Sequence, residues 1–264
     1  QSILDAVQES KADLGIIFDT DVDRAGAVLS DGTELNRNRI IAMMAAILLR
    51  EHPGTTIVTD SITSTGLAAF IRKHGGVHHR FKRGYRNVIN ESMRLNREGH
   101  DSQLAMETSG HGALKENYFL DDGAYLVTRL LIELARAKKE GYTLESLIAD
   151  LAEPAESKEF RMNILVPDFK AYGQKIIDEL NVYAASQPGW SVAPDNFEGV
   201  RVNLDKAHGD GWFLLRLSLH DPLIPLNIES DSVGGVRQIA AELAPFLRPF
   251  DQLDTSALLA FAGC

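Results

Sequence analysis

Three carboxylates follow an apolar run near the start of the chain: Asp19, Asp21 and Asp23 alternate with other residues, and Arg24 comes directly after them. The run Leu14–Phe18 predicts a strand buried on both faces. The carboxylates would then emerge at the edge of an α/β sheet where such sheets bind ligands. Three oxygen donors at this spacing can wrap Mg²⁺ at about 2.1 Å and leave room for a phosphate oxygen, which Arg24 could hold bidentately. The segment therefore indicates a hard-cation site that also accepts phosphate.

Three other interpretations compete for these aspartates. A calcium-binding EF-hand loop requires Gly at its sixth position and Glu at its twelfth, where this chain has Arg24 and Ser30, so that interpretation fails. Phosphatases of the haloacid-dehalogenase type also begin with a strand ending in Asp-x-Asp, which Asp19 and Asp21 resemble, but their fifth position is usually Thr or Val and here it is Asp23. The third alternative is that the aspartates form an acidic turn in solvent that binds no ligand.

A second group of polar residues follows the apolar run that ends at Met106. Glu107, Ser109 and His111 offer a carboxylate, a hydroxyl and an imidazole, and Gly110 permits close approach of a ligand. This set suits hydrogen bonds to vicinal sugar hydroxyls. A helix cap by Ser109 with His111 on the surface is the alternative. A Ser-His hydrolase is disfavoured because no Gly-x-Ser-x-Gly elbow surrounds Ser109.

A third group lies near residue 218. Alternation along the expected strand would turn Arg216, Ser218 and His220 to one face, with leucines on the other. The Arg fork, the hydroxyl and the imidazole could bind a phosphate, aided by backbone N–H groups before Pro222. A half-buried amphipathic strand with a solvated face explains the same pattern.

Alternating strands and helices must position these groups. Helices are expected at residues 3–10, 37–50, 66–74, 87–97, 125–138, 168–184 and 232–247, and strands at 14–18, 56–59, 77–81, 103–107, 200–204, 212–219 and 225–229. This order predicts an α/β fold: consecutive α/β domains with mixed sheets flanked by helices, followed by an α+β C-terminal domain. The polar stretch Glu153–Glu159 is the expected linker before that last domain.

Composition excludes several classes of protein. A net charge of −10 in 264 residues argues against a nucleic-acid partner, which requires a basic face. The longest apolar stretch, Ile40–Leu49, is half of the ~20 residues that span a bilayer, so we expect a buried helix and no membrane partner. The single cysteine, Cys264, allows a reducing compartment such as the cytoplasm or an organelle stroma. Because the chain begins with Gln1 and soon enters a strand, we expect further sequence upstream.

Taken in order, the three groups resemble the motifs of the α-D-phosphohexomutase superfamily, the phosphoglucomutases and phosphomannomutases. Its metal loop Asp-x-Asp-x-Asp-Arg matches residues 19–24, its sugar loop Gly-Glu-x-Ser-Gly-His matches residues 106–111 apart from Met106, and its Asp-Asp-Gly matches residues 121–123. Its phosphate loop Arg-x-Ser-x-Thr-x-Pro corresponds to residues 216–222, with Leu219 and His220 as departures. In the segment 82–85, where many relatives have Thr-Gly-His, Lys82 and Tyr85 are expected at the substrate, Tyr85 in place of an imidazole.

The resemblance implies three domains: the end of domain 2 at residues 1–52, domain 3 at 53–155 and domain 4 at 156–264. It implies that Mg²⁺ on the aspartates neutralises a phosphoserine, carried by N-terminal domains of the same protein that this sequence lacks, and that hexose 1-phosphate and hexose 6-phosphate are interconverted through a bisphosphate. Arg24 and His111 would be the catalytic residues, with Arg24 supporting the phosphoserine. The hexose phosphate would be bound by Lys82, Tyr85, Glu107, Ser109, His111, Arg216, Ser218 and His220. The fragment alone is then expected to be inactive. A mutase-derived protein that binds sugar phosphates without turnover is the alternative.

Overall fold

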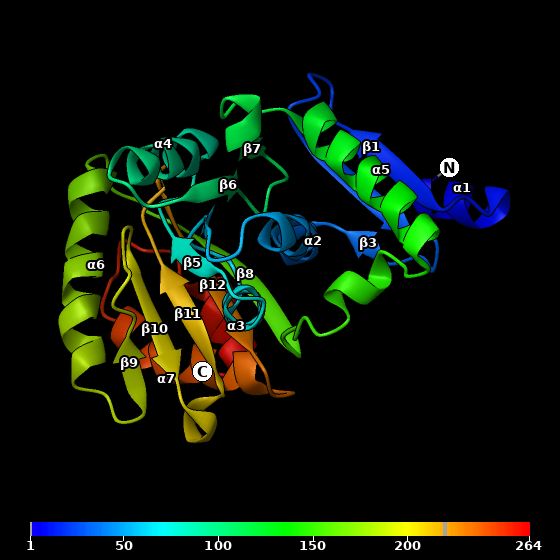
Figure 1. The fold of residues 1–264 in the computed structure, drawn as a ribbon. Coiled ribbons are helices and arrows are strands. Elements are labelled where there is room, and N and C mark those ends of the chain that lie inside the picture. Colours follow the sequence, from blue (N-terminus) through cyan, green and yellow to red (C-terminus); the bar gives the residue numbers. More distant parts are fainter. Residues whose placement is uncertain (1, 219–220) are drawn as a thin grey trace. The chain divides into compact units, whose positions relative to one another are not determined.

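The computed structural model describes residues 2–218 and 221–264, which form two compact units, Gln1–Ala152 and Glu153–Cys264. In the first unit strands and helices alternate from α2 to β6, and three consecutive strands precede α2 (Figure 1). They are α1 (Ile3–Ser10), β1 (Leu14–Phe18), β2 (Ala25–Leu29), β3 (Glu34–Leu35), α2 (Arg37–Glu51), β4 (Thr56–Thr59), α3 (Thr65–Lys73), β5 (Val77–Arg80), α4 (Tyr85–Arg97), β6 (Ser102–Met106), β7 (Gly112–Leu114), the 3₁₀ turn η1 (Lys115–Asn117), α5 (Gly123–Glu140) and η2 (Glu145–Ile148).

Two sheets make up the first unit. One is antiparallel, in the order β1-β2-β3, and the other is mixed, in the order β5-β4-β6-β7, with β4 parallel to β5 and β6 but β6 antiparallel to β7. The expected strand at 14–18 is present, but its expected environment is wrong. It pairs antiparallel with β2 and is the outer strand of its sheet, with Ile17 54% exposed. A short apolar run does not by itself distinguish a strand buried on both faces from an edge strand.

Helix α2 is the centre of this unit's core. Every residue from Ile40 to Leu49 is buried, which confirms the expected buried helix. The helix packs against α3, α5 and β6, so residues of both sheets share one apolar cluster. Apolar residues all around a helix are typical of one covered on every side.

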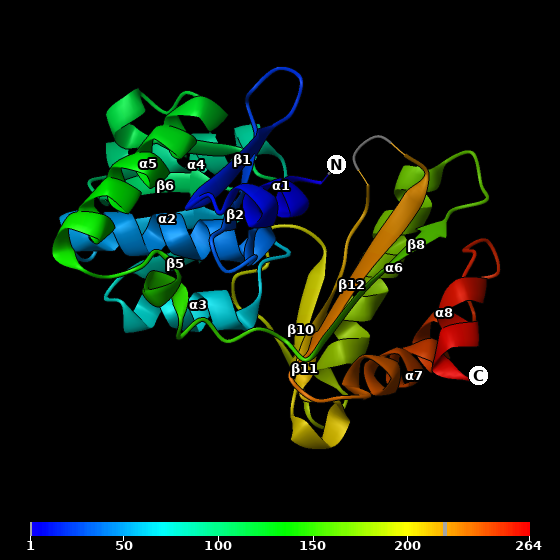
Figure 2. The same cartoon turned by 90° about the vertical axis from the view of Figure 1, so that its right-hand side faces the viewer.

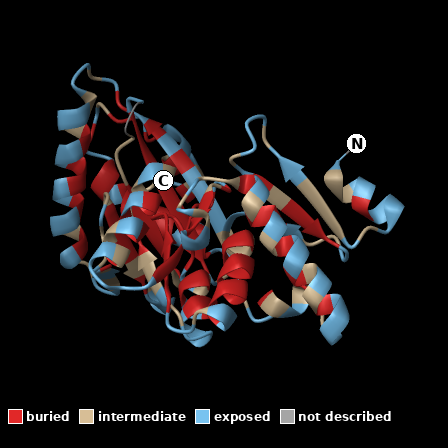
Figure 3. Ribbon diagram, turned by 45° about the horizontal axis from the view of Figure 1, so that its top comes forward, coloured by how far each residue is buried: buried red, intermediate tan, exposed pale blue. Residues whose placement is uncertain are grey.

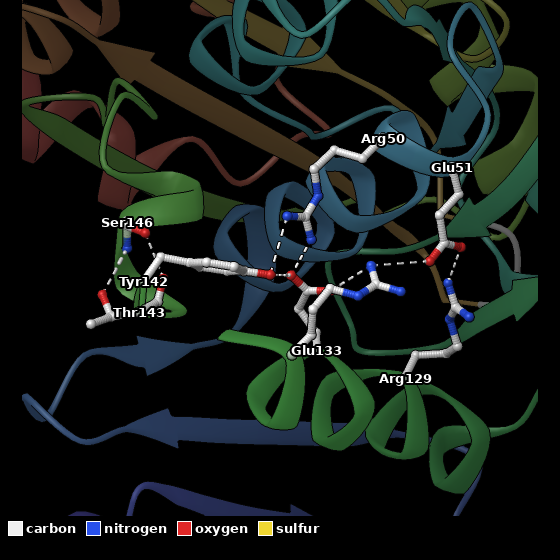
Figure 4. Close-up of polar contacts among 8 residues, drawn as sticks. Arg50, Glu51, Arg129, Glu133, Tyr142, Thr143 and Ser146 are labelled. Atoms are coloured by element: carbon white, nitrogen blue, oxygen red, sulfur yellow. Dashed lines mark hydrogen bonds and ion pairs between the residues drawn. The ribbon is translucent and has the colours of Figure 1, made fainter. Parts of the chain in front are cut away.

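Ion pairs connect α5 to α2 (Figure 4). Glu133 on α5 is 1% exposed, and its carboxylate accepts hydrogen bonds from Arg50 of α2 and, at 2.5 Å, from the hydroxyl of Tyr142. Arg136 lies 3.3 Å from the second oxygen. A charge so deeply buried requires partners of this kind, so the network fixes the helix that follows residues 121–122.

The second unit is a five-stranded antiparallel sheet with helices (Figure 2). Its elements are β8 (Glu156–Asn163), α6 (Phe169–Ala185), β9 (Trp190–Val192), β10 (Val200–Leu204), η3 (Lys206–His208), β11 (Gly211–Leu215), β12 (Leu223–Ser230), α7 (Gly235–Leu247) and α8 (Ser256–Ala262). The strand order is β8-β12-β11-β10-β9, and α6 and α7 bury their apolar faces in one core cluster with the sheet. Figure 3 shows buried residues on the strands and inner helix faces and exposed residues on the outer faces.

The predicted fold class, α/β with mixed sheets followed by an α+β part, is confirmed. The expected linker Glu153–Glu159 was partly wrong, because its second half belongs to β8, which pairs with β12 along its whole length. The polar, alternating sequence of β8 has only Phe160 and Met162 buried, so it gave a weak strand signal. Among the described residues no helix is both long and apolar enough to cross a bilayer.

Candidate functional site

The three aspartates occupy the turn of the β1–β2 hairpin. Phe18 pairs with Ala25 as the last rung of the ladder, so residues 19–24 form a short loop at the hairpin end. An oxygen from each of Asp19, Asp21 and Asp23 lies within 4.8 Å of the others. The aspartates therefore gather as expected, although at an antiparallel turn and not at the carboxyl edge of a parallel sheet.

Arg24 closes this loop on itself. Its Nε donates to Asp19 Oδ2 at 2.6 Å, and its backbone N–H donates to Asp19 Oδ1 at 3.3 Å. Partial desolvation acts to raise the pKa of Asp19, but the hydrogen bonds and charge of Arg24 outweigh it and hold that pKa below its usual value. Asp19 is therefore an anion at neutral pH.

The acidic turn fits a hard divalent cation. Carboxylate oxygens are the donors that Mg²⁺ prefers. Asp23 Oδ1 is shielded from solvent and accepts no hydrogen bond within the described residues, although Arg24 Nε lies 3.7 Å away. A buried carboxylate oxygen without a donor is unfavourable unless a cation or water satisfies it. The donor set and this oxygen are both consistent with a metal ligand role.

The expected sugar loop is the tight turn between β6 and β7. The backbone N–H of Glu107 donates to the carbonyl of His111 at 2.9 Å, and that of Gly110 donates to the carbonyl of Glu107 at 3.0 Å. Gly110 has φ +102°, and a Cβ there would lie 3.3 Å from the carbonyl oxygen of Ala25. Only glycine suits both the left-handed backbone and this close approach.

The sugar loop packs directly on the acidic turn between β1 and β2. Arg24 and His111 form an isolated antiparallel bridge between their backbones. His111 Nδ1 lies 3.7 Å from Asp23 Oδ2 and 2.8 Å from Asp121 Oδ2. The structure thus brings the first two predicted groups together, 80 and more residues apart in sequence.

Glu107 points into the protein and is 3% exposed. Its Oε1 accepts the backbone N–H of Gly84 at 2.5 Å, and its Oε2 accepts the hydroxyl of Ser109 at 3.2 Å. The bond to Gly84 ties the sugar loop to the segment that carries Lys82 and Tyr85. A carboxylate has about four acceptor positions, so these two bonds leave capacity for a ligand hydroxyl.

Lys82 and Tyr85 differ in their surroundings. Tyr85, the first residue of α4, stacks on the ring of His111 with centroids 4.9 Å apart and planes 20° from parallel. Lys82 is exposed to solvent. The replacement of an imidazole by Tyr85 therefore places an aromatic ring flat against the candidate histidine.

The contribution of Asp121 was missed by the sequence analysis, which identified residues 121–123 only as a motif. Asp121 hydrogen bonds to His111, and although burial raises the pKa of Asp121, its electrostatic interaction and hydrogen bond with His111 oppose that rise. Gly123 donates its N–H to the carbonyl of Val22 at 3.1 Å, and a Cβ on it would lie 2.8 Å from backbone atoms of Val22 and Arg24. The start of α5 is thus pressed against the acidic turn.

A cavity of about 340 Å³ opens beside these loops. Asp19 and Arg24 line it from the hairpin, Ser109 and Gly110 from the sugar loop, and Arg37 from the start of α2. Arg37 was not identified from the sequence. Arg37 adds a positive charge to the paired Asp19 and Arg24 in this lining, and an anionic ligand suits that net positive charge.

The third predicted group lies in the second unit. Strand β11 ends at Leu215, so the expected strand at 212–219 is too long, and Arg216 and Ser218 belong to the connection to β12. Their backbone N–H groups still donate to the carbonyls of Pro225 (3.2 Å) and Leu223 (3.0 Å). Ser218 Oγ accepts the N–H of Asp221 at 3.3 Å. His220 and Leu219 lie outside the described residues.

Comparisons with known proteins show which proteins the chain resembles. Residues 36–154 match the family model described as phosphoglucomutase/phosphomannomutase, alpha/beta/alpha domain III. The chain is 32% identical over 241 residues to a phosphomannomutase/phosphoglucomutase of Pseudomonas putida, and 29% identical over 240 residues to a phosphoglucomutase of Neisseria meningitidis. Each alignment covers 90% of this chain and 48% of the relative. The chain therefore spans about half the length of the curated relatives it matches.

A solved structure of a phosphoglucomutase/phosphomannomutase family protein from Burkholderia thailandensis superposes with a TM-score of 0.76 at 28% identity. The match covers 96% of this chain and 51% of that one. The phosphoglucomutase pp63/parafusin of Paramecium has the same fold, with a TM-score of 0.65 at 15% identity over 100% of this chain and 49% of its own.

Proposed function

The chain belongs to the α-D-phosphohexomutase superfamily, and from this premise we propose that it supplies the metal, sugar and phosphate contacts of an enzyme that interconverts hexose 1-phosphate and hexose 6-phosphate. Glucose and mannose phosphates are the proposed substrates, since the relatives carry those names. The transferred phosphoryl group would be carried by a phosphoserine on N-terminal domains outside this sequence. The single observation that carries the proposal is the backbone bridge between Arg24 and His111, which joins the acidic turn to the sugar loop.

The acidic turn would hold Mg²⁺ through Asp19, Asp21 and Asp23. When bound, the ion would neutralise negative charge on a phosphoryl group during transfer. Arg24 keeps Asp19 ionised and in place, and it lines the cavity in which that phosphoryl group would lie. Positioning and charge neutralisation are most of what phosphoryl transfer requires of a protein.

The sugar loop would orient the substrate. Glu107 and Ser109 would bind sugar hydroxyls with the acceptor and donor capacity left after their mutual hydrogen bond. Asp121, as an acceptor at 2.8 Å, favours the proton of His111 on Nδ1 and leaves Nε2 to accept or return a proton at the reacting hydroxyl. Tyr85 restricts rotation of the imidazole by stacking on it.

Arg216, Ser218 and His220 would bind the phosphate that does not react. Binding energy at this remote group can be used to orient the reacting hydroxyl. Leu219 and His220 depart from the superfamily pattern, and this observation favours a second candidate function, the binding of sugar phosphates without turnover. The antiparallel pairing of β1 and the bond between Asp19 and Arg24 argue against the phosphatase, which needs a free nucleophilic aspartate.

The test has two arms. In the first, calorimetry measures binding of glucose 1-phosphate and mannose 1-phosphate to residues 1–264 with Mg²⁺, where we expect binding that Ser109→Ala weakens. In the second, ³¹P NMR follows glucose 1-phosphate with this chain alone and with the complete protein, where we expect conversion only by the latter. Turnover by residues 1–264 alone contradicts the need for a separate phosphoserine domain. A complete protein that binds hexose phosphate but never converts it supports the second candidate.

A further inference from the structure

Asp60 is a buried carboxylate that the proposed chemistry does not use. It follows β4, at the carboxyl end of a parallel strand whose neighbour β6 leads into the sugar loop. Its exposed fraction is 0%. An aspartate side chain is rarely buried so completely unless hydrogen-bond donors or an opposite charge pair with it.

Both oxygens of Asp60 bind one residue of the sugar loop. The backbone N–H of Thr108 donates to Oδ1 at 3.2 Å, and the hydroxyl of Thr108 donates to Oδ2 at 2.8 Å. Thr108 stands between Glu107 and Ser109, the two residues proposed to contact sugar hydroxyls. A carboxylate that accepts two donors from one residue fixes the position and the rotation of that residue together.

Glu107 forms two further hydrogen bonds at the same loop. Through the N–H of Gly84 and the hydroxyl of Ser109, it connects the loop to the start of α4. The sugar loop is therefore hydrogen-bonded to two buried carboxylates, that of Asp60 directly after β4 and that of its own residue Glu107. We call this arrangement of Asp60, Thr108 and Glu107 the two-carboxylate clamp.

The two carboxylates of the clamp, Asp60 and Glu107, repel each other when both are ionised. Burial, the main cause, and the nearby charge of Glu107 raise the pKa of Asp60 to about 6, while the hydrogen bonds from Thr108 and the charge of Arg83 act in the opposite direction. Glu107 and Arg83 are the charged groups that act on Asp60 most strongly among the described residues. Uptake of a proton by Asp60 would relieve this repulsion and remove one of the positions that accept hydrogen bonds from Thr108.

We propose that Asp60 is a positioning residue for sugar recognition, which acts through Thr108 to keep Glu107 and Ser109 in the orientation that binds the hexose hydroxyls. The inference rests on the proposed function. It adds a residue that makes no contact with substrate. Loss of the clamp would let the sugar loop move. The contacts of Glu107 and Ser109 with the hexose hydroxyls would then weaken, while the acidic turn at residues 19–24 would stay intact.

The first experiment measures the affinity of the whole chain for glucose 1-phosphate by calorimetry at 10 °C and pH 8, with Mg²⁺. We expect Asp60→Ala to weaken binding about ten-fold, comparable to one lost charged hydrogen bond. Asp60→Asn should bind about two- to three-fold more weakly than the wild type, because its amide keeps one acceptor for the Thr108 N–H and can donate to the Thr108 hydroxyl but carries no charge. Glu91→Ala is the matched control: Glu91 is another buried carboxylate of this unit, on α4, bound to His79 and Arg94.

The second experiment compares the wild type and Asp60→Asn from pH 5 to pH 8. Titration of the ligand phosphate, near pH 6, is common to both proteins and cancels in the ratio of their affinities. We expect the two-fold or larger advantage of the wild type at pH 8 to disappear below pH 6, as Asp60 takes up a proton and becomes, like asparagine, a neutral side chain with one acceptor and one donor. A ratio independent of pH, or an Asp60→Ala protein that is folded and binds as tightly as the wild type, overturns the proposal.

Hydrogen exchange separates failure of this inference from failure of the proposed function. If the wild type binds no hexose phosphate, the proposed function fails, and the clamp is judged by the amide of Thr108 alone. That amide should exchange at least ten-fold faster in Asp60→Ala than in the wild type, and no faster in Glu91→Ala. Equal exchange of Thr108 in Asp60→Ala and wild type overturns the clamp, whatever the ligand result.

Discussion

The substitution Asp60→Asn makes folding stability less dependent on pH. Asp60 is fully buried, and burial, followed by the charge of Glu107, raises its pKa from 3.8 to about 6. In that interval the folded state binds more protons than the unfolded state, so stability falls as pH rises through it and is constant above it. Asparagine does not titrate, which removes this dependence.

The size of the effect follows from the shift. A difference of about two pKa units corresponds to about 3 kcal/mol, at 1.36 kcal/mol per unit. The free energy of unfolding of Asp60→Asn, relative to the wild type, should therefore rise by about 2–3 kcal/mol between pH 4 and pH 7.5. The other titrating groups are shared by the two proteins and, apart from Glu107, whose charge interacts with that of Asp60, they cancel in the comparison.

Urea unfolding followed by circular dichroism measures this difference. Both tryptophans, Trp190 and Trp212, lie in the second unit, so their fluorescence gives an internal reference that the substitution should leave unchanged. If the stability difference is the same at pH 4 and pH 7.5, the reasoning about Asp60 is refuted. A shift in the tryptophan transition would show that the two units do not unfold independently.

Three further predictions concern the first unit. Glu133→Ala should lower its free energy of unfolding in urea by about 2–3 kcal/mol, because Arg50, Arg136 and Tyr142 lose the buried carboxylate that accepts their hydrogen bonds. The exposed Glu98→Ala should change it by less than about 1 kcal/mol, and equal effects would contradict the role of burial. Gly123→Ala should weaken Mn²⁺ binding, measured by electron paramagnetic resonance, about ten-fold or more, since its Cβ would meet the backbone of the acidic turn; unchanged affinity would show that this packing is unimportant. Asp19→Asn should weaken metal binding, and a loss of covalent phosphate capture, detected by mass spectrometry, would instead indicate a phosphatase.

Local patterns predicted most elements because they depend on neighbouring residues alone. The helix at 37–50 and the strands at 14–18 and 56–59 were predicted within one residue of the observed bounds. The motif residues Asp19 to Arg24 and Glu107 to His111 were also found from sequence, and the structure places them side by side. Their roles in catalysis and binding stay predictions.

What the sequence did not reveal depends on contacts between distant segments. The antiparallel partner of β1 could not be inferred from an apolar run. No sequence pattern links Asp60 to Thr108 or Asp121 to His111, and only folding brings the members of each pair within hydrogen-bond distance. Burial and pairing of a charge are properties of the fold and not of the local pattern.

The central claim is that the turn at Asp19–Asp23 holds a divalent cation beside the sugar loop. Mn²⁺, substituted for Mg²⁺, broadens NMR signals of nuclei near it, so a titration of the wild type tests both parts of the claim at once. We predict early and selective broadening at the amides of Asp21, Gly110 and His111, reversed by excess Mg²⁺ and absent in Asp21→Asn. Broadening of the turn without the sugar loop, or none at either, would contradict the account.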